Sequence, residues 1–106
     1  MGKQLQAFTS DQFGQIRTIE NDGQPWFVAA DVCAALELAN PTVTVSRLDK
    51  DEKAKFNLGL SGGPAWCVNE PGLYSLVLAC RKPQARAFKR WITHEVIPAI
   101  RKHGLY

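Results

Sequence analysis

The stretch NDGQPWFVAADVCAALEL, residues 21–38, contains a turn, a strand and a helix in succession. Its first three residues are a strong turn signal, because Asp and Gly tolerate the positive φ angles that tight hairpins need. QPWFV then predicts a strand rich in aromatic residues. AADVCAALEL predicts a helix of two to three turns with Asp31 as its N-cap and an apolar stripe along one side. A strand followed directly by a helix indicates a mixed α and β fold.

The residues before this stretch also predict β structure. AFTSDQF (residues 7–13) and QIRTIE (residues 15–20) contain β-forming side chains, and Gly14 between them fits a tight turn. With QPWFV they predict three short antiparallel strands. Pro25 fits the start of a strand or a sheet edge, because proline cannot donate a backbone hydrogen bond.

The residues after this stretch allow two interpretations. The β-branched run at residues 43–45 favours a strand, whereas Asn40 followed by Pro41 is typical of a helix start. We favour a short helix over residues 41–48. DKDEK, residues 49–53, then predicts a mixed-charge turn on the surface.

A second hairpin is predicted next. KFNLGL (residues 55–60) and PAWCV (residues 64–68) flank a glycine-containing tip. Gly62 and Gly63 at this tip can adopt positive φ, which a hairpin turn requires.

Two helices are predicted in the last third of the chain. Asn69 can cap the first of them, and Pro71 fits its first turn. Its sequence GLYSLVLAC (residues 72–80) is apolar almost all round, which predicts a helix buried in the core. Pro83 opens the second helix.

This last helix is amphipathic at about 100° per residue. Its apolar side holds Ala85, Phe88, Trp91, Ile92 and Val96. Its basic side holds Lys82, Arg86, Lys89, Arg90 and Thr93. Pro98 predicts a kink because it removes a backbone donor, and Gly104 predicts the helix end.

The length and composition predict one α+β domain over residues 1–106, with small antiparallel sheets and hairpins packed against about four short helices. No stretch holds the roughly 18 apolar residues of a membrane span, and the first residues lack the apolar run of a secretory signal. Cys33, Cys67 and Cys80 form no C-x-x-C pair. We therefore expect reduced thiols in a cytoplasmic protein, with no membrane partner and no metal site.

Positive charge is concentrated at the C-terminal end. Residues 81–106 hold seven of the 13 Lys and Arg residues and one of the ten acids, so residues 1–80 hold six bases and nine acids. This asymmetry indicates an anionic partner, of which nucleic acid is the commonest. The alternative is a basic, solvated helix face that binds nothing. Aromatic residues could stack on bases, but we expect them to pack in the core.

Enzyme signatures are absent from the sequence. Neither a G-x-S-x-G nor a P-loop pattern occurs. His94 and Glu95 begin an H-E-x-x-H zinc motif, but Pro98 occupies the position of the second histidine. Ser75 lies in an apolar segment with no histidine nearby in sequence. We therefore expect a protein with no catalytic activity and no cofactor.

Three ordered blocks resemble one known family. They are GQPWFVAADV at residues 23–32, NEPGLYSL at residues 69–76 and ARAFKRWITHEVIPAIRKHG at residues 85–104. With the DKDEK turn between the first two, they resemble the BRO N-terminal domain (Bro-N) of phage antirepressors and of BRO proteins from large DNA viruses. The resemblance covers nearly all of residues 8–106.

The resemblance implies a DNA-binding domain of an antirepressor-type transcription regulator from a phage or prophage. Members of this family usually continue into a second domain, so we expect the chain to be the N-terminal part of a longer protein, with a stand-alone domain as the alternative. The motif residues that we expect to be core or turn positions are Trp26, Phe27, Pro71, Gly72, Leu73, Phe88 and Trp91.

We expect basic side chains to contact double-stranded DNA, mainly at its phosphates. The predicted contacts are Arg47, Lys50, Lys53, Lys55, Arg81, Lys82, Arg86, Lys89 and Arg90. Arg47, near the end of the short helix, is the residue that we expect to reach base edges. This role would place the protein at the nucleoid of a bacterial host cell. The alternative is a module that sequesters a repressor protein without binding DNA, and homo-oligomers are compatible with either role.

Overall fold

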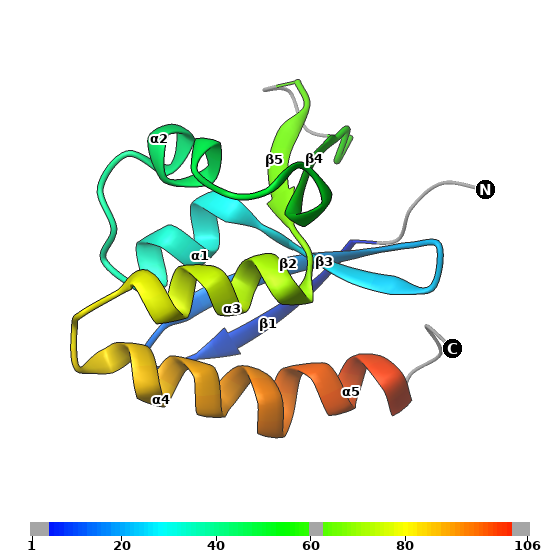
Figure 1. Ribbon diagram of the computed structural model, residues 1–106. Coiled ribbons are helices and arrows are strands. Elements are labelled where there is room, and N and C mark those ends of the chain that lie inside the picture. Colours follow the sequence, from blue (N-terminus) through cyan, green and yellow to red (C-terminus); the bar gives the residue numbers. More distant parts are fainter. Residues whose placement is uncertain (1–4, 60–62, 103–106) are drawn as a thin grey trace.

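The two predicted hairpins join into one antiparallel sheet in the computed structural model, which describes residues 5–59 and 63–102 (Figure 1). The strands are β1 (Leu5–Ser10), β2 (Gly14–Asn21), β3 (Gln24–Val28), β4 (Lys53–Phe56) and β5 (Ala65–Val68). Phe27 of β3 pairs with Val68 of β5, which gives the order β1-β2-β3-β5-β4. The α+β class is confirmed, with a single five-stranded sheet.

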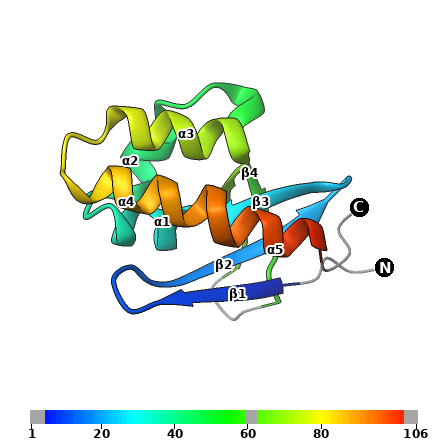
Figure 2. The same cartoon turned by 90° about the horizontal axis from the view of Figure 1, so that it is seen from below.

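The helices gather on one face of this sheet (Figures 1 and 2). They are α1 (Ala29–Ala35), α2 (Pro41–Ser46), the 3₁₀ turn η1 (Lys50–Glu52), α3 (Glu70–Ala79), α4 (Gln84–Trp91), the π-helical turn η2 (Ile92–Val96) and α5 (Ile97–Lys102). None of the helices within residues 5–59 and 63–102 is long and apolar enough to cross a membrane.

The β2–β3 turn forms as predicted, because Asp22 and Gly23 both adopt positive φ, at 55° and 76°. The predicted first strand is too long at its C-terminal end. The hydroxyl of Ser10 accepts hydrogen bonds from the backbone N–H groups of Gln12 and Phe13, which turns the chain. Gly63 adopts a φ of 79° as expected, whereas Gly62 and Gly104 lie outside the described residues.

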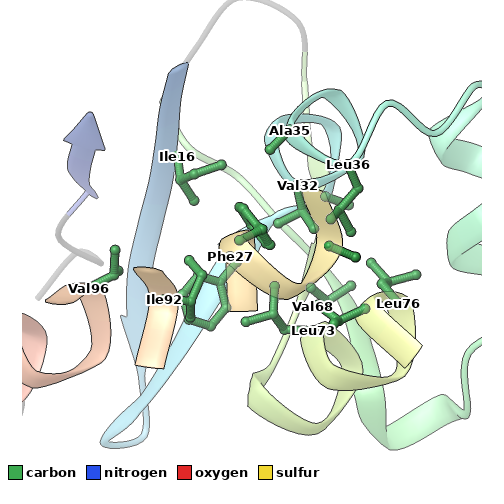
Figure 3. Close-up of a cluster of buried hydrophobic side chains, with 14 of the residues drawn as sticks. Ile16, Phe27, Val32, Ala35, Leu36, Val68, Leu73, Leu76, Ile92 and Val96 are labelled. Carbon is green, nitrogen blue, oxygen red and sulfur yellow. The ribbon is translucent and has the colours of Figure 1, made fainter. Parts of the chain in front are cut away.

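The main core lies between the sheet and the helices. Figure 3 shows side chains from β2, β3, α1, α3 and η2 converging around Phe27. Phe27 and Phe88 are fully buried and Trp26 is nearly so, which confirms the expectation of core packing for these three aromatic residues. Trp66 and Trp91 are half-buried.

A smaller apolar cluster lies on the opposite face of the sheet, because successive strand residues point to opposite sides. Ile19, Trp26, Val28 and Cys67 are its buried members. Phe56 of β4 packs edge-on against Trp26, with ring centroids 5.2 Å apart. The β4–β5 hairpin therefore contributes to both clusters.

The prediction of Asp31 as an N-cap is wrong. Val28 occupies the N-cap position of α1, and Asp31 lies in the first turn. The Asp31 carboxylate instead accepts hydrogen bonds from Arg17, at 2.9 Å from its backbone N, 2.8 Å from Nε and 2.9 Å from Nη2. Thr18 is the first residue of β2 that pairs with β3, so Arg17 lies just before this pairing begins and Asp31 provides the acceptor for its backbone N–H.

The predicted helix at residues 41–48 is confirmed in α2, where the side chain of Asn40 accepts a hydrogen bond from the N–H of Val43. In α3 the helix is confirmed but its complete burial is not. Leu73 and Leu76 face the core, whereas Leu78 is 85% exposed. The outward side of α3 is apolar and remains uncovered.

The last helix has the two predicted faces. Ala85, Phe88, Ile92 and Val96 are buried and Trp91 is half-buried. The sequence predicted a kink at Pro98. The helix contains the π-helical turn η2 just before this proline, and α5 follows directly. A wider turn accommodates a proline, whose ring would otherwise meet the carbonyl four residues earlier.

Candidate nucleic-acid interface

Five of the predicted contacts lie together on α4 and the bend before it. Arg81, Lys82, Arg86, Lys89 and Arg90 are all exposed, and we call them the α4 basic group. The amphipathic pattern places them outward because the opposite side of α4 is buried in the core. Lys82 Nζ donates a hydrogen bond to the carbonyl of Glu37, which ties the bend to the α1–α2 connection.

Two shallow hollows connect the members of this group. Arg86, Lys89 and Arg90 line a hollow of about 530 Å³ with Thr93 and His94. Arg81, Lys82, Arg86 and Lys89 line a second hollow at the α3–α4 bend. In the described part of the chain, no carboxylate lines either hollow.

Carboxylates of the described residues do not pair with the α4 basic group. Over residues 5–59 and 63–102, none of its five side chains forms an ion pair with a carboxylate. Uncompensated positive charge on a fixed helix face raises the local potential and attracts anions.

A third hollow extends this face in a way that the sequence did not predict. Gln12 and Phe13 of the β1–β2 turn line it together with Arg90, His94 and the carboxylate residue Glu95. The Phe13 ring stacks on Trp91 with centroids 5.8 Å apart, which holds the turn against α4. No sequence pattern links residues so far apart along the chain, so spacing could not reveal this contact.

The other four predicted contacts, Arg47, Lys50, Lys53 and Lys55, lie near α2 and the β4–β5 hairpin. We call them the hairpin basic group. Arg47 and Lys50 are exposed. Arg47 lines a hollow between α2 and α3 that also includes Asp49 and Glu52, so acids accompany this positive charge.

Two lysines of the hairpin basic group have partners inside the domain. Lys53 Nζ donates a hydrogen bond of 3.2 Å to the carbonyl of Ser46. Lys53 and Lys55 also lie over the Trp66 ring, with Nζ 5.9 Å and 5.1 Å from its centroid. Such cation–π contacts hold the lysine side chains against the protein surface.

The structure does not merge the two basic groups. The helix α3 lies between α2 with the β4–β5 hairpin on one side and α4 on the other (Figure 1). The described outward residues of α3 include Leu78 and Ala79, which carry no charge. Any ligand that contacts both groups must therefore pass over an apolar helix.

The DKDEK turn is anchored to α3, which its mixed charge did not indicate. Asp49 and Glu52 form a capping box around η1. The buried Asn69 side chain donates to the carbonyl of Asp51 at 2.7 Å and accepts from the N–H of Gly72 at 2.9 Å. A Cβ atom at Gly72 would lie 2.5 Å from the carbonyl of Glu52, so only glycine fits here.

The cysteines are free thiols. Cys33 and Cys67 are buried, Cys80 is half-buried, and burial raises the pKa of Cys67 to about 12. A thiol with such a pKa stays protonated and unreactive at neutral pH. Within residues 5–59 and 63–102, no three His, Cys, Asp or Glu side chains are grouped so as to hold a metal ion.

Comparison with known proteins identifies relatives of this chain. Residues 15–98 match the BRO family, N-terminal domain, Bro-N. An uncharacterized protein of Haemophilus influenzae is 33% identical over 83% of this chain and 45% of its own length. A putative Bro-N domain-containing protein of Invertebrate iridescent virus 3 is 35% identical over 59% of this chain and 14% of its own length.

A putative Bro-N domain-containing protein of Invertebrate iridescent virus 6 is 26% identical over 91% of this chain and 28% of its own length. The chain thus spans less than half the length of these curated relatives. No solved structure matches it at a significant level. The match over residues 15–98 includes β3, β4 and β5, all of β2 except Gly14, and all the helices except part of α5. It shows that the chain belongs to the BRO family and carries its N-terminal Bro-N domain.

Proposed function

We propose that this chain is the DNA-binding domain of an antirepressor-type transcription regulator of a phage or prophage. The observation that carries the proposal is the α4 basic group, whose five exposed cations lie on α4 and the bend before it without a paired carboxylate in the described chain. Membership of the Bro-N family supports the same role. We propose binding without catalysis or a cofactor, in a bacterial host cell at its nucleoid.

The α4 basic group would contact phosphates of double-stranded DNA, and each contact would release counterions. Its members on α4, Arg86, Lys89 and Arg90, are fixed by the buried opposite side of that helix, so they present charge at defined positions. The hairpin basic group is a second candidate contact region, in which Arg47 remains the predicted base-reading residue. Its separation by α3 makes it secondary in this proposal.

Duplex binding measured against salt concentration tests the proposal. If all five members of the α4 basic group contact phosphates, the slope of log K against log salt should be about −4.5. A fluorescence-anisotropy titration of a labelled duplex at several salt concentrations gives this slope. Absence of duplex binding at ~50 mM salt and micromolar protein would rule the proposal out.

The alternative function is a protein-interaction module that sequesters a repressor without binding DNA. The observation that favours it is the exposed Leu78 on α3, because an exposed apolar side chain next to other apolar groups marks protein contacts more often than phosphate contacts. Intact repressor binding in a variant that has lost all duplex affinity would support this alternative.

A further inference from the structure

Among the described residues, the most exposed large apolar side chain lies on the outward side of α3. Leu78 is 85% exposed, whereas the other exposed large apolar residues described, Val43 and Leu5, are 43% and 39% exposed. A helix that is apolar all round belongs in a core, and only one side of α3 faces this core. The other side therefore lacks a cover in the isolated domain.

Leu78 is part of a groove between α3 and α4. Tyr74, Val77, Leu78, Lys89 and Thr93 line this groove of about 360 Å³, and we call it the Leu78 groove. The two helices run side by side along it (Figure 2). Grooves between paired helices accept the apolar side of a third helix.

The charged side chains that line the Leu78 groove and the adjoining hollow at the bend are all positive. Leu78 and Val77 also line the hollow at the α3–α4 bend, together with Arg81, Lys82, Arg86 and Lys89. The described linings of both hollows include no carboxylate. Glu70, one turn before Tyr74, accepts a hydrogen bond from the Tyr74 hydroxyl at 3.0 Å and lies 3.9 Å from Arg101.

We propose that the Leu78 groove docks an acidic amphipathic helix of a partner protein, with apolar side chains over Leu78 and carboxylates toward the α4 basic group. Charge complementarity selects this occupant. A second copy of the chain in a twofold contact would place Lys89 and Arg86 near their own equivalents, which repel. A phosphate backbone has no apolar surface with which to cover Leu78.

The Leu78 groove and the proposed DNA surface share Lys89, and Arg86 lines the adjoining hollow at the α3–α4 bend. An occupant of the groove that contacts both side chains therefore excludes DNA from them. A docked acidic helix would displace DNA from α4. The docking proposal itself does not rest on DNA binding, because Leu78 and the acidic partner do not require a duplex.

A designed peptide provides a defined probe. It is a labelled helix of about 16 residues with Leu at positions i, i+4 and i+7 and Glu beside them. We expect it to bind the wild-type chain, and Leu78→Ser to weaken this binding about tenfold or more. Leu78→Met should bind like the wild type, since it conserves volume. Val43→Ser, which removes another exposed apolar side chain, on α2, should have no effect on peptide binding.

Further readouts separate this proposal from the proposed function. Leu78→Ser should leave the duplex affinity within about twofold of wild type, because no phosphate contact is lost. Thermal melting of each variant confirms its fold. Loss of duplex affinity in Leu78→Ser without a change in peptide binding would assign the groove to DNA and overturn the proposal.

Three other outcomes would also overturn the proposal. The first is that the wild-type chain fails to bind the peptide at millimolar concentration. The second is that a peptide with Ser in place of Leu binds equally well, which would reduce the effect to charge attraction. The third is that sedimentation shows a dimer that Leu78→Ser dissociates, which would make a second copy of the chain the occupant of the groove.

Discussion

The two basic groups of this domain contain similar residues in different surroundings. The α4 basic group lies on α4 and the bend before it, and no acid lines the two hollows that connect its members; Glu95 lines only the third hollow, beside Arg90. The hairpin basic group is interleaved with acids, and two of its lysines lie over Trp66. Positive charge that already has partners within the protein has less to gain from a ligand. Charge count alone would have ranked the two groups nearly equally.

The largest test of this comparison is charge reversal in matched pairs. Arg86→Glu with Arg90→Glu should weaken duplex binding about 100-fold, because two phosphate contacts become repulsive. Lys50→Glu with Lys55→Glu changes the net charge equally and should weaken it less than tenfold. Anisotropy titrations at one salt concentration compare them. Equal losses in the two pairs would remove the distinction between the groups.

A second test concerns Asn69, which holds the DKDEK turn beside the hairpin basic group against α3. Asn69→Ala should lower the free energy of unfolding by about 2 kcal/mol, because it removes the cap of α3 and leaves the Asp51 carbonyl without its donor. Arg86→Ala, on the exposed face of α4, should stay within about 0.5 kcal/mol of wild type. Urea denaturation measures both. A neutral Asn69→Ala would mean that the turn is not anchored through α3.

A third test addresses α3, which separates the two groups. Burial raises the pKa of Tyr74 to about 12, and the hydrogen bond to Glu70 adds to the shift. Tyr74→Phe should lower stability by about 1 kcal/mol at neutral pH through loss of this hydrogen bond.

The pH dependence of this difference has a defined sign. An unfolded tyrosine loses its proton near pH 10 and folded Tyr74 near pH 12, so the contribution of Tyr74 is complete below pH 10 and falls as pH rises toward 12. The gap between wild type and Tyr74→Phe in denaturation midpoint should therefore narrow over this range. Wild type and Tyr74→Phe contain the same cysteines, so the difference between their denaturation midpoints does not include the ionisation of these thiols. A constant gap would contradict the assignment.

The smallest expected effect is the coupling between Lys55 and Trp66. A double-mutant cycle with Lys55→Ala and Trp66→Leu should give a coupling energy of about 0.5 kcal/mol, typical of an exposed cation–π contact. Lys89→Ala combined with Trp66→Leu serves as the control and should be additive. A coupling of zero for Lys55 would show that this lysine is as available to ligands as Lys89.

Local chemistry made much of this fold predictable. The positive φ at Asp22 and Gly23, the Asn40 and Asn69 caps and the amphipathic pattern of α4 each depend on residues close in sequence. The predictions failed where the determining contact is distant. Asp31 resembled a cap, but its partner Arg17 lies on another element.

The candidate interface shows the same division. Helical spacing placed Arg86, Lys89 and Arg90 on one exposed face. The separation of the two basic groups by α3 depends on how the β4–β5 hairpin joins β3, which no local pattern encodes. The apolar outward side of α3 also escaped prediction, because a segment apolar all round does not indicate which side its own core will leave uncovered.

The π-helical turn η2 changes the direction in which side chains point around the axis of the last helix. Arg90 and Arg101 are eleven residues apart, so an uninterrupted α-helix would point them within about 20° of each other. One wide turn acts like an inserted residue and rotates everything after it by about 100°. Arg101 accordingly reaches Glu70 of α3. The rotation ends the row of outward charge at η2, which limits the length of any ligand that the row can follow.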